Sequence, residues 1–330
     1  ALPISKLAPL VQGIQSQDVA ACVKHFALNN QECDRLSVDT KVDDKTLFEL
    51  YLPAFYDALM EGGSCSVMGA YNKYDGEFCC ENATLLKKIL RDLWHYDGVT
   101  ISDWGGVHNT EKTALNGVDM EMSVTPDFDD YKLANPLLEK VKSGKIDESV
   151  IDERIERILT MMERIKLGDK TRNKGCTNTK DHQQTIQQIA EEGIVLLKND
   201  TAHLPLSKET KKILVLGDNA KRTHAAGGGS AEIKALYDIS PLLGMRMVLG
   251  GDAQIDWLPG YYVDNEKHVA GEVDWQAESL DVDYTTDRGK EQFDKEIRPI
   301  REKYLKEALD ACSSYDEVIF IGGLNHAYDV

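Results

Sequence analysis

Polar and ionisable residues recur directly after short apolar runs in the first third of the sequence. Lys24 and His25 end the first run, Met68 and Tyr71 lie near the end of the second, and Asp103 follows the third. Lysine, histidine and tyrosine side chains donate hydrogen bonds, and a carboxylate can act as a nucleophile. The combination suits binding of a hydroxyl-rich ligand and attack on it by the carboxylate.

Each of these residues also has an ordinary structural explanation. Lys24 can lay its methylene groups along an apolar surface, and His25 can be a satisfied core histidine. Trp104 could stack on a sugar ring, but core packing is the commoner fate of a tryptophan. Asp103 could simply cap a helix over 108–117. Only the combination of residues favours chemistry over structure.

The elements that would position these residues are parallel strands alternating with helices. Four short runs rich in β-branched residues are predicted as strands: 19–25, 65–72, 99–103 and 118–122. Apolar residues at helical spacing predict helices around 52–59, 85–93 and 148–166. Because parallel strands end at the same edge of a sheet, the polar residues should converge there.

Four such units are half of a closed eight-stranded barrel. We therefore predict an α/β protein in which residues 1–167 form the C-terminal half of a (β/α)8 TIM-like barrel. A half barrel has two unpaired sheet edges. The missing strands are expected from sequence upstream of Ala1 or from another chain packed against this one.

The remainder of the sequence predicts a second domain. Residues 168–182 contain almost no large apolar residue and are predicted as a linker. Residues 183–330 should form a doubly wound α/β sandwich domain that is incomplete at its C-terminal end. A helix over 182–193, the apolar run V-L-L-K, and strands at 213–217 and 317–322 are its expected parts. The acidic, aperiodic stretch 250–300 gives no assignment.

Composition and absent motifs exclude several classes of function. Asp and Glu number 56 against 38 Lys and Arg, a net charge of -18 that repels nucleic acid. There is no apolar run long enough to cross a membrane. The seven cysteines form no C-x-x-C pair, so a zinc site has no support, and we expect mostly buried thiols with at most one disulfide bridge. Serine-hydrolase, zinc-protease and P-loop motifs are missing, and no cofactor is expected.

Several segments occur in an order and spacing that match a known family. Those of the first domain are V-A-A-C-V-K-H-F-A-L-N-N-Q-E, S-V-M-G-A-Y-N-K-Y-D-G-E, G-V-T-I-S-D-W-G-G and G-V-D-M-E-M. Those of the second are E-E-G-I-V-L-L-K-N-D-T-A-H-L-P-L, I-L-V-L-G-D-N-A and G-G-G-S-A-E-I. Together they strongly resemble the β-glucosidases of glycoside hydrolase family 3. The resemblance covers nearly the whole chain.

The resemblance implies a role for each candidate residue. In the family the aspartate of S-D-W is the nucleophile of a retaining glycosidase, which assigns that role to Asp103. Further residues are implied in binding the substrate: Lys24, His25, Met68, Tyr71, Trp104 and Ser230. The Lys-His pair would bind hydroxyls of the departing sugar, and the tryptophan would border the aglycone. The serine would reach the rim of the site from the second domain.

One part of the family's pattern is missing from the sequence. The general acid/base is a glutamate that follows a segment like G-L-N-H-A-Y-D at 323–329, so it is expected immediately beyond Val330. The sugar-holding aspartate and arginine that precede the Lys-His strand are missing as well. Residues 1–330 alone should therefore be inactive. The expected partners are the remaining segments of the same enzyme or another chain that completes the barrel, and a homodimer is a further possibility.

Three rival functions were weighed against a β-glucosidase. N-acetylhexosaminidases of the family carry K-H-F-P-G-x-G, whereas this sequence has K-H-F-A-L-N-N. A non-catalytic sugar-binding module is permitted by the missing flanks but disfavoured by the intact S-D-W. A metal- or nucleotide-dependent enzyme lacks its motifs. We predict a β-linked glucoside as substrate, xyloside as a side activity, and a secreted or periplasmic location rather than a cytoplasmic one.

Overall fold

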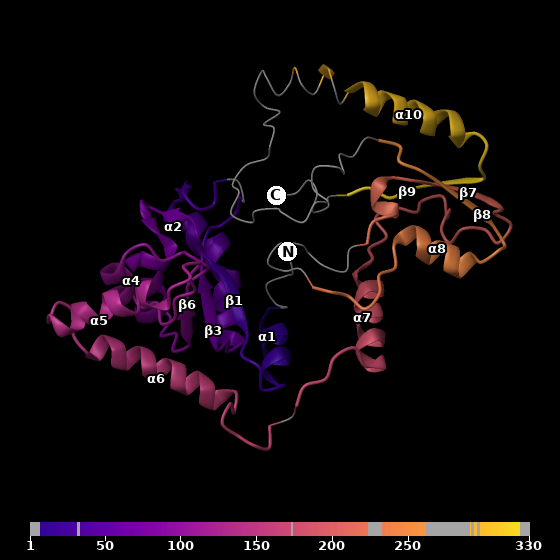
Figure 1. Cartoon of the computed structure of the whole chain (residues 1–330). Helices are drawn as coiled ribbons and strands as arrows, with labels where there is room; N and C mark the ends of the chain where they lie inside the picture. Colours follow the sequence, from indigo (N-terminus) through magenta and orange to yellow (C-terminus); the bar gives the residue numbers. More distant parts are fainter. Residues whose placement is uncertain are drawn as a thin grey trace. The chain divides into compact units, whose positions relative to one another are not determined.

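The computed structural model describes residues 7–31, 34–172, 174–223, 233–261, 291, 294–295 and 298–323. The chain divides into two compact units, Ala1–Gly175 and Cys176–Val330 (Figure 1). The division falls inside the segment 168–182 for which we predicted a linker. Each unit is described by itself below.

A parallel three-stranded sheet forms the centre of the first unit. Its strands are β1 (Cys22–Phe26), β3 (Ser66–Gly69) and β6 (Val99–Ile101), in the order β1-β3-β6. Cys22 lies opposite Ser66, which in turn lies opposite Val99. The first three predicted strands are confirmed, although each is shorter than predicted. The polar residues that follow them therefore lie at one edge of the sheet.

The fourth predicted strand, 118–122, is wrong. The segment makes one parallel bridge, between Ile101 and Met120, and no longer ladder within the described residues. Its backbone approaches β6 at Thr100, whose carbonyl accepts hydrogen bonds from the N–H groups of Asp119 and Met120. The Thr100 N–H, however, donates to the Asp119 carboxylate at 2.7 Å. The side chain thus takes the bond that a strand partner would have accepted.

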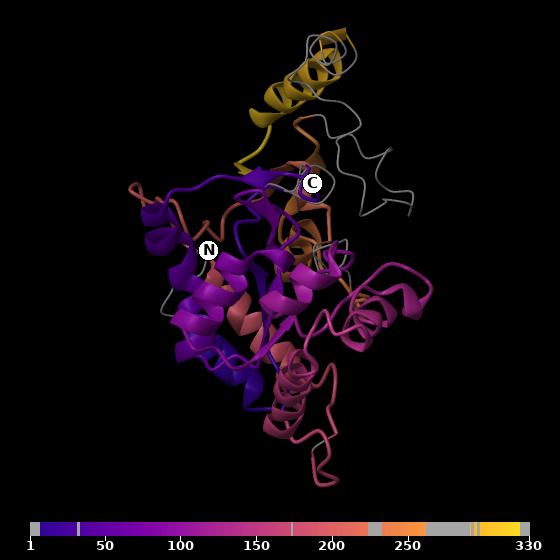
Figure 2. The same cartoon turned by 90° about the vertical axis from the view of Figure 1, so that its left-hand side faces the viewer.

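Helices gather around this sheet (Figures 1 and 2). A continuous helical run over 44–61 is divided into α2 (Asp44–Thr46), η2 (Leu47–Tyr51), α3 (Leu52–Tyr56) and η3 (Asp57–Glu61). The other helices of the unit are α1 (Leu7–Gln15), η4 (Cys79–Glu81), η5 (Thr84–Leu93), α4 (Thr110–Asn116), η6 (Phe128–Asp130), α5 (Asn135–Lys142) and α6 (Ser149–Arg164). The three predicted helices of this domain are confirmed.

Apolar residues of these helices fill the core of the first unit. Leu52 and Leu59 of the first helical run and Leu85 and Leu90 of η5 are buried against Phe26 of β1. The segments that follow β1 and β3 in the sequence form a small side sheet. Its strands, in the order β2-β4-β5, are β2 (Asp39–Thr40), β4 (Lys73–Tyr74) and β5 (Glu77–Phe78). Core and side sheet together fix the loops that carry the polar residues.

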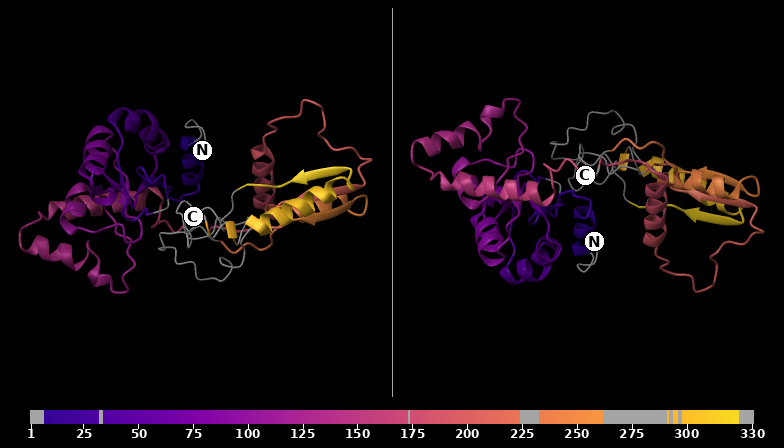
Figure 3. Two further views of the ribbon diagram at one scale, coloured as in Figure 1. Left: turned by 90° about the horizontal axis from the view of Figure 1, so that it is seen from above. Right: turned by 90° about the horizontal axis from the view of Figure 1, so that it is seen from below.

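The second unit is a parallel sheet between two helices. Its strands are β7 (Lys212–Leu216), β8 (Gln254–Leu258) and β9 (Glu317–Phe320), in the order β8-β7-β9. Helix α8 (Pro241–Leu249) packs on the face that carries Ile213 and Val215. Helix α10 (Arg298–Cys312) packs on the face that carries Leu214 and Leu216, and lies beside β9 in Figure 3. Alternate residues of β7 thus face opposite layers.

Other elements of this unit include α7 (Lys180–Gly193) and η7 (Asp218–Ala220). The predicted helix over 182–193 and the strands at 213–217 and 317–322 are confirmed. The V-L-L-K run forms no element, and Leu197 is 92% exposed. Helices α8 and α10 and strand β8 were not predicted. Within the described residues, no helix has both the length and the apolar character needed to cross a bilayer.

The cysteines only partly match the expectation of buried thiols. The six that the structure describes are free thiols. Cys65, Cys79 and Cys80 are buried, Cys312 is half-buried, and two are exposed, Cys22 and Cys176. Position in the sequence did not separate the exposed cysteines from the buried ones.

Candidate active site

Three of the predicted site residues meet at the carboxyl edge of the first sheet. The Nε2 atom of His25, on β1, lies 3.3 Å from Oδ2 of Asp103, which follows β6. Tyr71, which follows β3, makes a side-chain hydrogen bond to the same carboxylate. The three strands therefore each bring one polar side chain to a single point, as predicted from their spacing.

Asp103 is held by its own turn rather than by a helix. Its Oδ1 accepts the Trp104 N–H at 2.9 Å, and its backbone carbonyl accepts the Gly106 N–H at 3.0 Å. Helix α4 is capped instead by Asn109, whose Oδ1 accepts the Lys112 N–H at 3.0 Å. The helix-capping explanation for Asp103 is therefore wrong. Its side chain is 11% exposed, so a ligand could reach the carboxylate.

Tyr71 is a buried hydrogen-bond donor beside this carboxylate. Burial raises the pKa of Tyr71 well above its ordinary value, and the charge of Asp103 and the hydrogen bond to it raise the pKa further. The phenol consequently keeps its proton over the physiological pH range and donates it to Asp103. A tyrosine in this state can stabilise the negative charge of Asp103 while it stays uncharged itself.

Arg35 joins the site although sequence reasoning missed it. Its guanidinium carbon lies 5.1 Å from the centre of the Tyr71 ring, in a cation–π contact. A guanidinium offers five N–H donors for hydroxyl or carboxylate oxygens. The sequence feature that could have indicated Arg35 is its position in the polar run N-N-Q-E-C-D-R, which follows Lys24 and His25.

The remaining predicted residues lie at different depths. Lys24 is exposed next to His25, and the peptide bond between the two is cis. Met68 is 8% exposed and lies opposite Ile101 in the sheet. Trp104 is 43% exposed, so the core-packing explanation for this residue is wrong. Ser230 lies outside the described residues, as does the segment 324–330.

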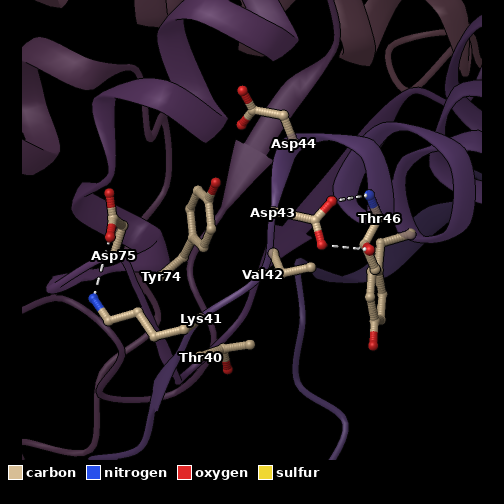
Figure 4. Close-up of a pocket in the computed structure, with 9 residues that line it drawn as sticks. Thr40, Lys41, Val42, Asp43, Asp44, Thr46, Tyr74 and Asp75 are labelled. Carbon is tan, nitrogen blue, oxygen red and sulfur yellow. Dashed lines mark hydrogen bonds and ion pairs between the residues drawn. The ribbon is translucent and has the colours of Figure 1, made fainter.

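A surface hollow of about 630 Å³ lies elsewhere, on the loops around the side sheet (Figure 4). Three of its charged side chains have partners within the lining: Asp43 accepts the N–H and the hydroxyl of Thr46, and Lys41 pairs with Asp75 at 3.1 Å. Its lining does not include His25, Tyr71 or Asp103. The sheet edge is the better candidate for a functional site because ionisable side chains converge on it.

No three His, Cys, Asp or Glu side chains within the described ranges are grouped so that they could hold a metal ion. The chemistry available at the sheet edge is that of one carboxylate surrounded by hydrogen-bond donors.

Comparison with known proteins identifies the family. The model of the glycosyl hydrolase family 3 N terminal domain matches residues 5–161, and that of the family 3 C-terminal domain matches residues 194–329. The chain belongs to glycosyl hydrolase family 3. Membership confirms the resemblance seen in the sequence and agrees with the α/β architecture of both units.

Curated family 3 relatives are longer than this chain. The β-glucosidase BoGH3A of Bacteroides ovatus is 36% identical over 332 residues, which cover 96% of this chain and 41% of that protein. Thermostable β-glucosidase B of Acetivibrio thermocellus is 36% identical over 82% of this chain and 36% of its own length. The chain spans well under half the length of either relative.

Solved family 3 structures are similar to this one. The β-glucosidase of Kluyveromyces marxianus in complex with glucose has a TM-score of 0.68 and 34% identity, over 78% of this chain and 31% of that one. The family 3 β-glucosidase of Bifidobacterium adolescentis has a TM-score of 0.73 and 26% identity, over 98% of this chain and 41% of that one. The similarity thus extends over both units.

Proposed function

We propose that this chain carries the nucleophile and part of the sugar site of a retaining β-glucosidase. The observation that carries the proposal is the meeting of His25, Tyr71 and Asp103 at one sheet edge. Membership of family 3 and relatives named β-glucosidases support it. The reaction would release β-linked glucose from the non-reducing end of oligosaccharides or glucosides, and cellulose breakdown is a suitable context.

The proposed reaction has two steps. In the first, the Asp103 carboxylate attacks the anomeric carbon, the glycosidic C–O bond breaks, and an acid protonates the departing oxygen. In the second, water deprotonated by the same group attacks that carbon and releases Asp103 with the sugar's configuration retained. The acid/base is expected about 5 to 5.5 Å from the nucleophile in such enzymes. We predict a glutamate beyond Val330 for this role.

The other residues would bind the sugar. Lys24, His25 and Arg35 are donors suited to ring hydroxyls, and Tyr71 would stabilise the charge of Asp103. Met68 would line the sugar subsite. The exposed indole of Trp104 is suited to stacking on the aglycone. Ser230, from the second domain, would reach the rim.

The first unit is proposed to be the C-terminal half of a (β/α)8 barrel, and the second a doubly wound sandwich domain. Within the described residues, β1 pairs on one side only. Remaining segments of the same enzyme, or another chain, would supply strands for that edge, and a homodimer is one way to do so. A secreted or periplasmic location belongs to the same proposal and is tested by fractionation of the source cells.

Covalent trapping tests the proposal directly. The full-length protein would be treated with an aryl 2-deoxy-2-fluoro-β-glucoside, which accumulates the glycosyl-enzyme, and the labelled peptide would be mapped. We expect the label on Asp103. A label on another carboxylate contradicts the assignment, and sugar binding with neither label nor turnover would favour a non-catalytic module.

Substrate preference needs a separate measurement. A panel of aryl β-glycosides should give the highest kcat/KM for the glucoside, with the xyloside second because both sugars present equatorial hydroxyls to the same donors. A marked preference for the N-acetylglucosaminide would place the protein in the hexosaminidase branch instead.

A further inference from the structure

Cys80 lies where the three strands of the candidate site come together. It belongs to η4, is 0% exposed, and its Sγ is 3.7 Å from the carbonyl oxygen of Ala70. Ala70 directly follows β3, and its N–H donates to Phe26 at the end of β1 at 2.9 Å. Through Ala70, the thiol is therefore connected to the ends of two strands.

The same sulfur contacts the third strand's end. The Asp103 backbone interacts with the Cys80 thiol and lowers its pKa, and both the Cys80 Sγ and the Asp103 nitrogen border the same point, 3.5 and 3.6 Å from where a β-carbon on Gly106 would lie. Burial has the larger effect and raises the pKa of the Cys80 thiol, so the group stays neutral. A neutral thiol is a weak donor and a weak acceptor at once. It can thus donate S–H to Ala70 while it accepts the Asp103 N–H.

Two glycines allow the backbone to approach this sulfur closely. A β-carbon on Gly69, the last residue of β3, would lie 2.6 Å from the Cys80 Sγ. A β-carbon on Gly106 would lie 3.5 Å from the same sulfur and 3.2 Å from the Asp103 carbonyl oxygen. The thiol is therefore closely packed between the end of β3 and the turn that carries Asp103.

We propose that Cys80 is a positioning residue for Asp103: its thiol joins the Ala70 carbonyl to the Asp103 N–H and so fixes the carboxylate relative to His25 and Tyr71. The inference rests on the proposed function, because it assigns a role in placing the nucleophile. The thiol itself touches no substrate. Its effect should appear in the rate of nucleophilic attack rather than in sugar binding.

The neighbouring Cys79 provides a matched control. It is also 0% exposed, and its thiol also donates to a backbone carbonyl, that of Ala27 at 3.3 Å. Burial raises its pKa to about 12, so this thiol is neutral as well. The two residues thus share type, burial and kind of partner, but only Cys80 has a hydrogen bond to Asp103 among the contacts described.

The experiment compares four variants of the full-length protein: Cys80→Ala, Cys80→Val, Cys80→Ser and Cys79→Ala. Each is assayed well below its thermal midpoint for kcat, KM and the rate of labelling by the fluorinated glucoside. A displacement of the nucleophile by a fraction of an ångström can cost about 10- to 100-fold in rate. We expect losses of that size in kcat and labelling for Cys80→Ala and Cys80→Val, with KM changed by less than about threefold.

Serine keeps a donor and an acceptor, so Cys80→Ser should recover most of the lost rate. Cys79→Ala should lose a similar amount of thermal stability but keep kcat within about threefold, because its partner is Ala27 and not Asp103. Full rate in Cys80→Ala and Cys80→Val would overturn the inference. So would an equal loss of kcat in Cys79→Ala.

A poorly folding Cys80→Ala would not end the test. Gly106→Ala leaves the thiol intact and presses a methyl group towards the sulfur and the Asp103 carbonyl, so it should slow labelling without weakening glucose binding. Unchanged labelling in Gly106→Ala overturns the inference. If the parent protein is labelled at a residue other than Asp103, both the proposed nucleophile and this inference are overturned. If Asp103 is labelled at the parent's rate in the Cys80 variants, this inference alone is overturned.

Discussion

Asp103 and Asp119 are both buried aspartates next to β6, but their partners differ. Asp119 has a side chain with 0% exposure, and it accepts hydrogen bonds from Arg91 at 3.0 Å, Arg157 at 2.8 Å and the Thr100 N–H at 2.7 Å. Asp103 keeps 11% exposure, and its partners are an imidazole, a phenol and its own neighbour's N–H.

The difference separates a structural carboxylate from the one for which we propose a chemical role. Two guanidinium groups and a backbone donor use both oxygens of Asp119, so this side chain is a fixed part of the fold. Asp103 has no guanidinium partner in the contacts described, and its side chain keeps 11% exposure. Burial alone does not identify a nucleophile, because both residues are buried. The kind of partner is what distinguishes the two aspartates.

The largest effect should follow from removing the proposed nucleophile. Asp103→Gly in the full-length protein should lower kcat for an aryl β-glucoside by about 10⁴-fold or more, because no group replaces the nucleophile. Azide added to this variant should restore release of the phenol and yield an α-glucosyl azide. Activity within tenfold of the parent, or failure of azide to react, would contradict the role of Asp103.

The second effect concerns stability rather than rate. Asp119→Ala removes a fully buried carboxylate and leaves the half-buried Arg91 and Arg157 without their anion, which should lower the free energy of unfolding by about 3–5 kcal/mol. Asp103→Asn should change it by less than about 1 kcal/mol. Urea titration of both variants measures the contrast. Equal losses would remove the distinction drawn between the two aspartates.

A smaller effect is expected at the phenol. Tyr71→Phe keeps the ring beneath Arg35 but removes the hydrogen bond to Asp103, and loss of one such donor should reduce kcat/KM by about 10- to 100-fold. The unfolding midpoint should move little. Steady-state kinetics with the aryl glucoside measures the rate, and Tyr74→Phe, in β4 of the side sheet, is a control that should leave it unchanged.

The smallest effect is a pH dependence near a third buried carboxylate, Glu81. Its Oε1 accepts the backbone N–H groups of His108 and Asn109 at 2.7 and 2.5 Å. Partial burial lowers the pKa of His108 from 6.5, and the Glu81 charge opposes this shift. The unfolded chain therefore binds a proton at higher pH than the folded one, so stability should fall as pH drops below about 6.5.

His108→Phe should make the unfolding midpoint less sensitive to pH in this range, because phenylalanine does not titrate and can keep the stacking contact with Phe78. Melting curves between pH 7.5 and pH 5.5 measure the change. His182→Gln, on the exposed helix α7, should preserve the parent's pH profile. A His108→Phe profile identical to the parent's would contradict the expected contribution.

Local patterns were sufficient to place Asp103 and His25. A short β-branched run followed by polar residues indicates where a parallel strand ends, and such ends share one sheet edge. The pattern failed at 118–122, which also contains apolar residues followed by polar ones but forms no strand. There the Asp119 side chain takes the Thr100 N–H, a tertiary contact that no periodicity contains.

Contacts between distant segments explain the other omissions at the site. Arg35 reaches Tyr71 from a loop 36 residues earlier in the chain, in a contact no spacing rule gives. Cys79 and Cys80 are identical neighbours in the sequence, and only packing distinguishes their partners.

The second unit shows a different limit. Helix α10 has apolar residues at helical spacing, but Leu305 and Leu309 are 53% and 64% exposed among many charges, so its amphipathic pattern is weak. Strand β8 has only five residues and lies in the acidic stretch that gave no assignment. Conversely, the strongly apolar V-L-L-K run suggested an ordered element and is exposed instead.

The Arg91–Asp119–Arg157 cluster also determines how the first unit should respond to salt and heat. Mobile ions reach exposed pairs such as Lys112–Glu77 and weaken them, but they have less access to the Asp119 carboxylate, which is 0% exposed between arginine side chains that are 15% and 18% exposed. Hydration of charged groups becomes less favourable on warming, so keeping these charges buried costs less at high temperature. The junction between β6 and the Val118 segment should therefore resist high salt concentrations and moderate heating better than the parts of the unit that are held by exposed ion pairs.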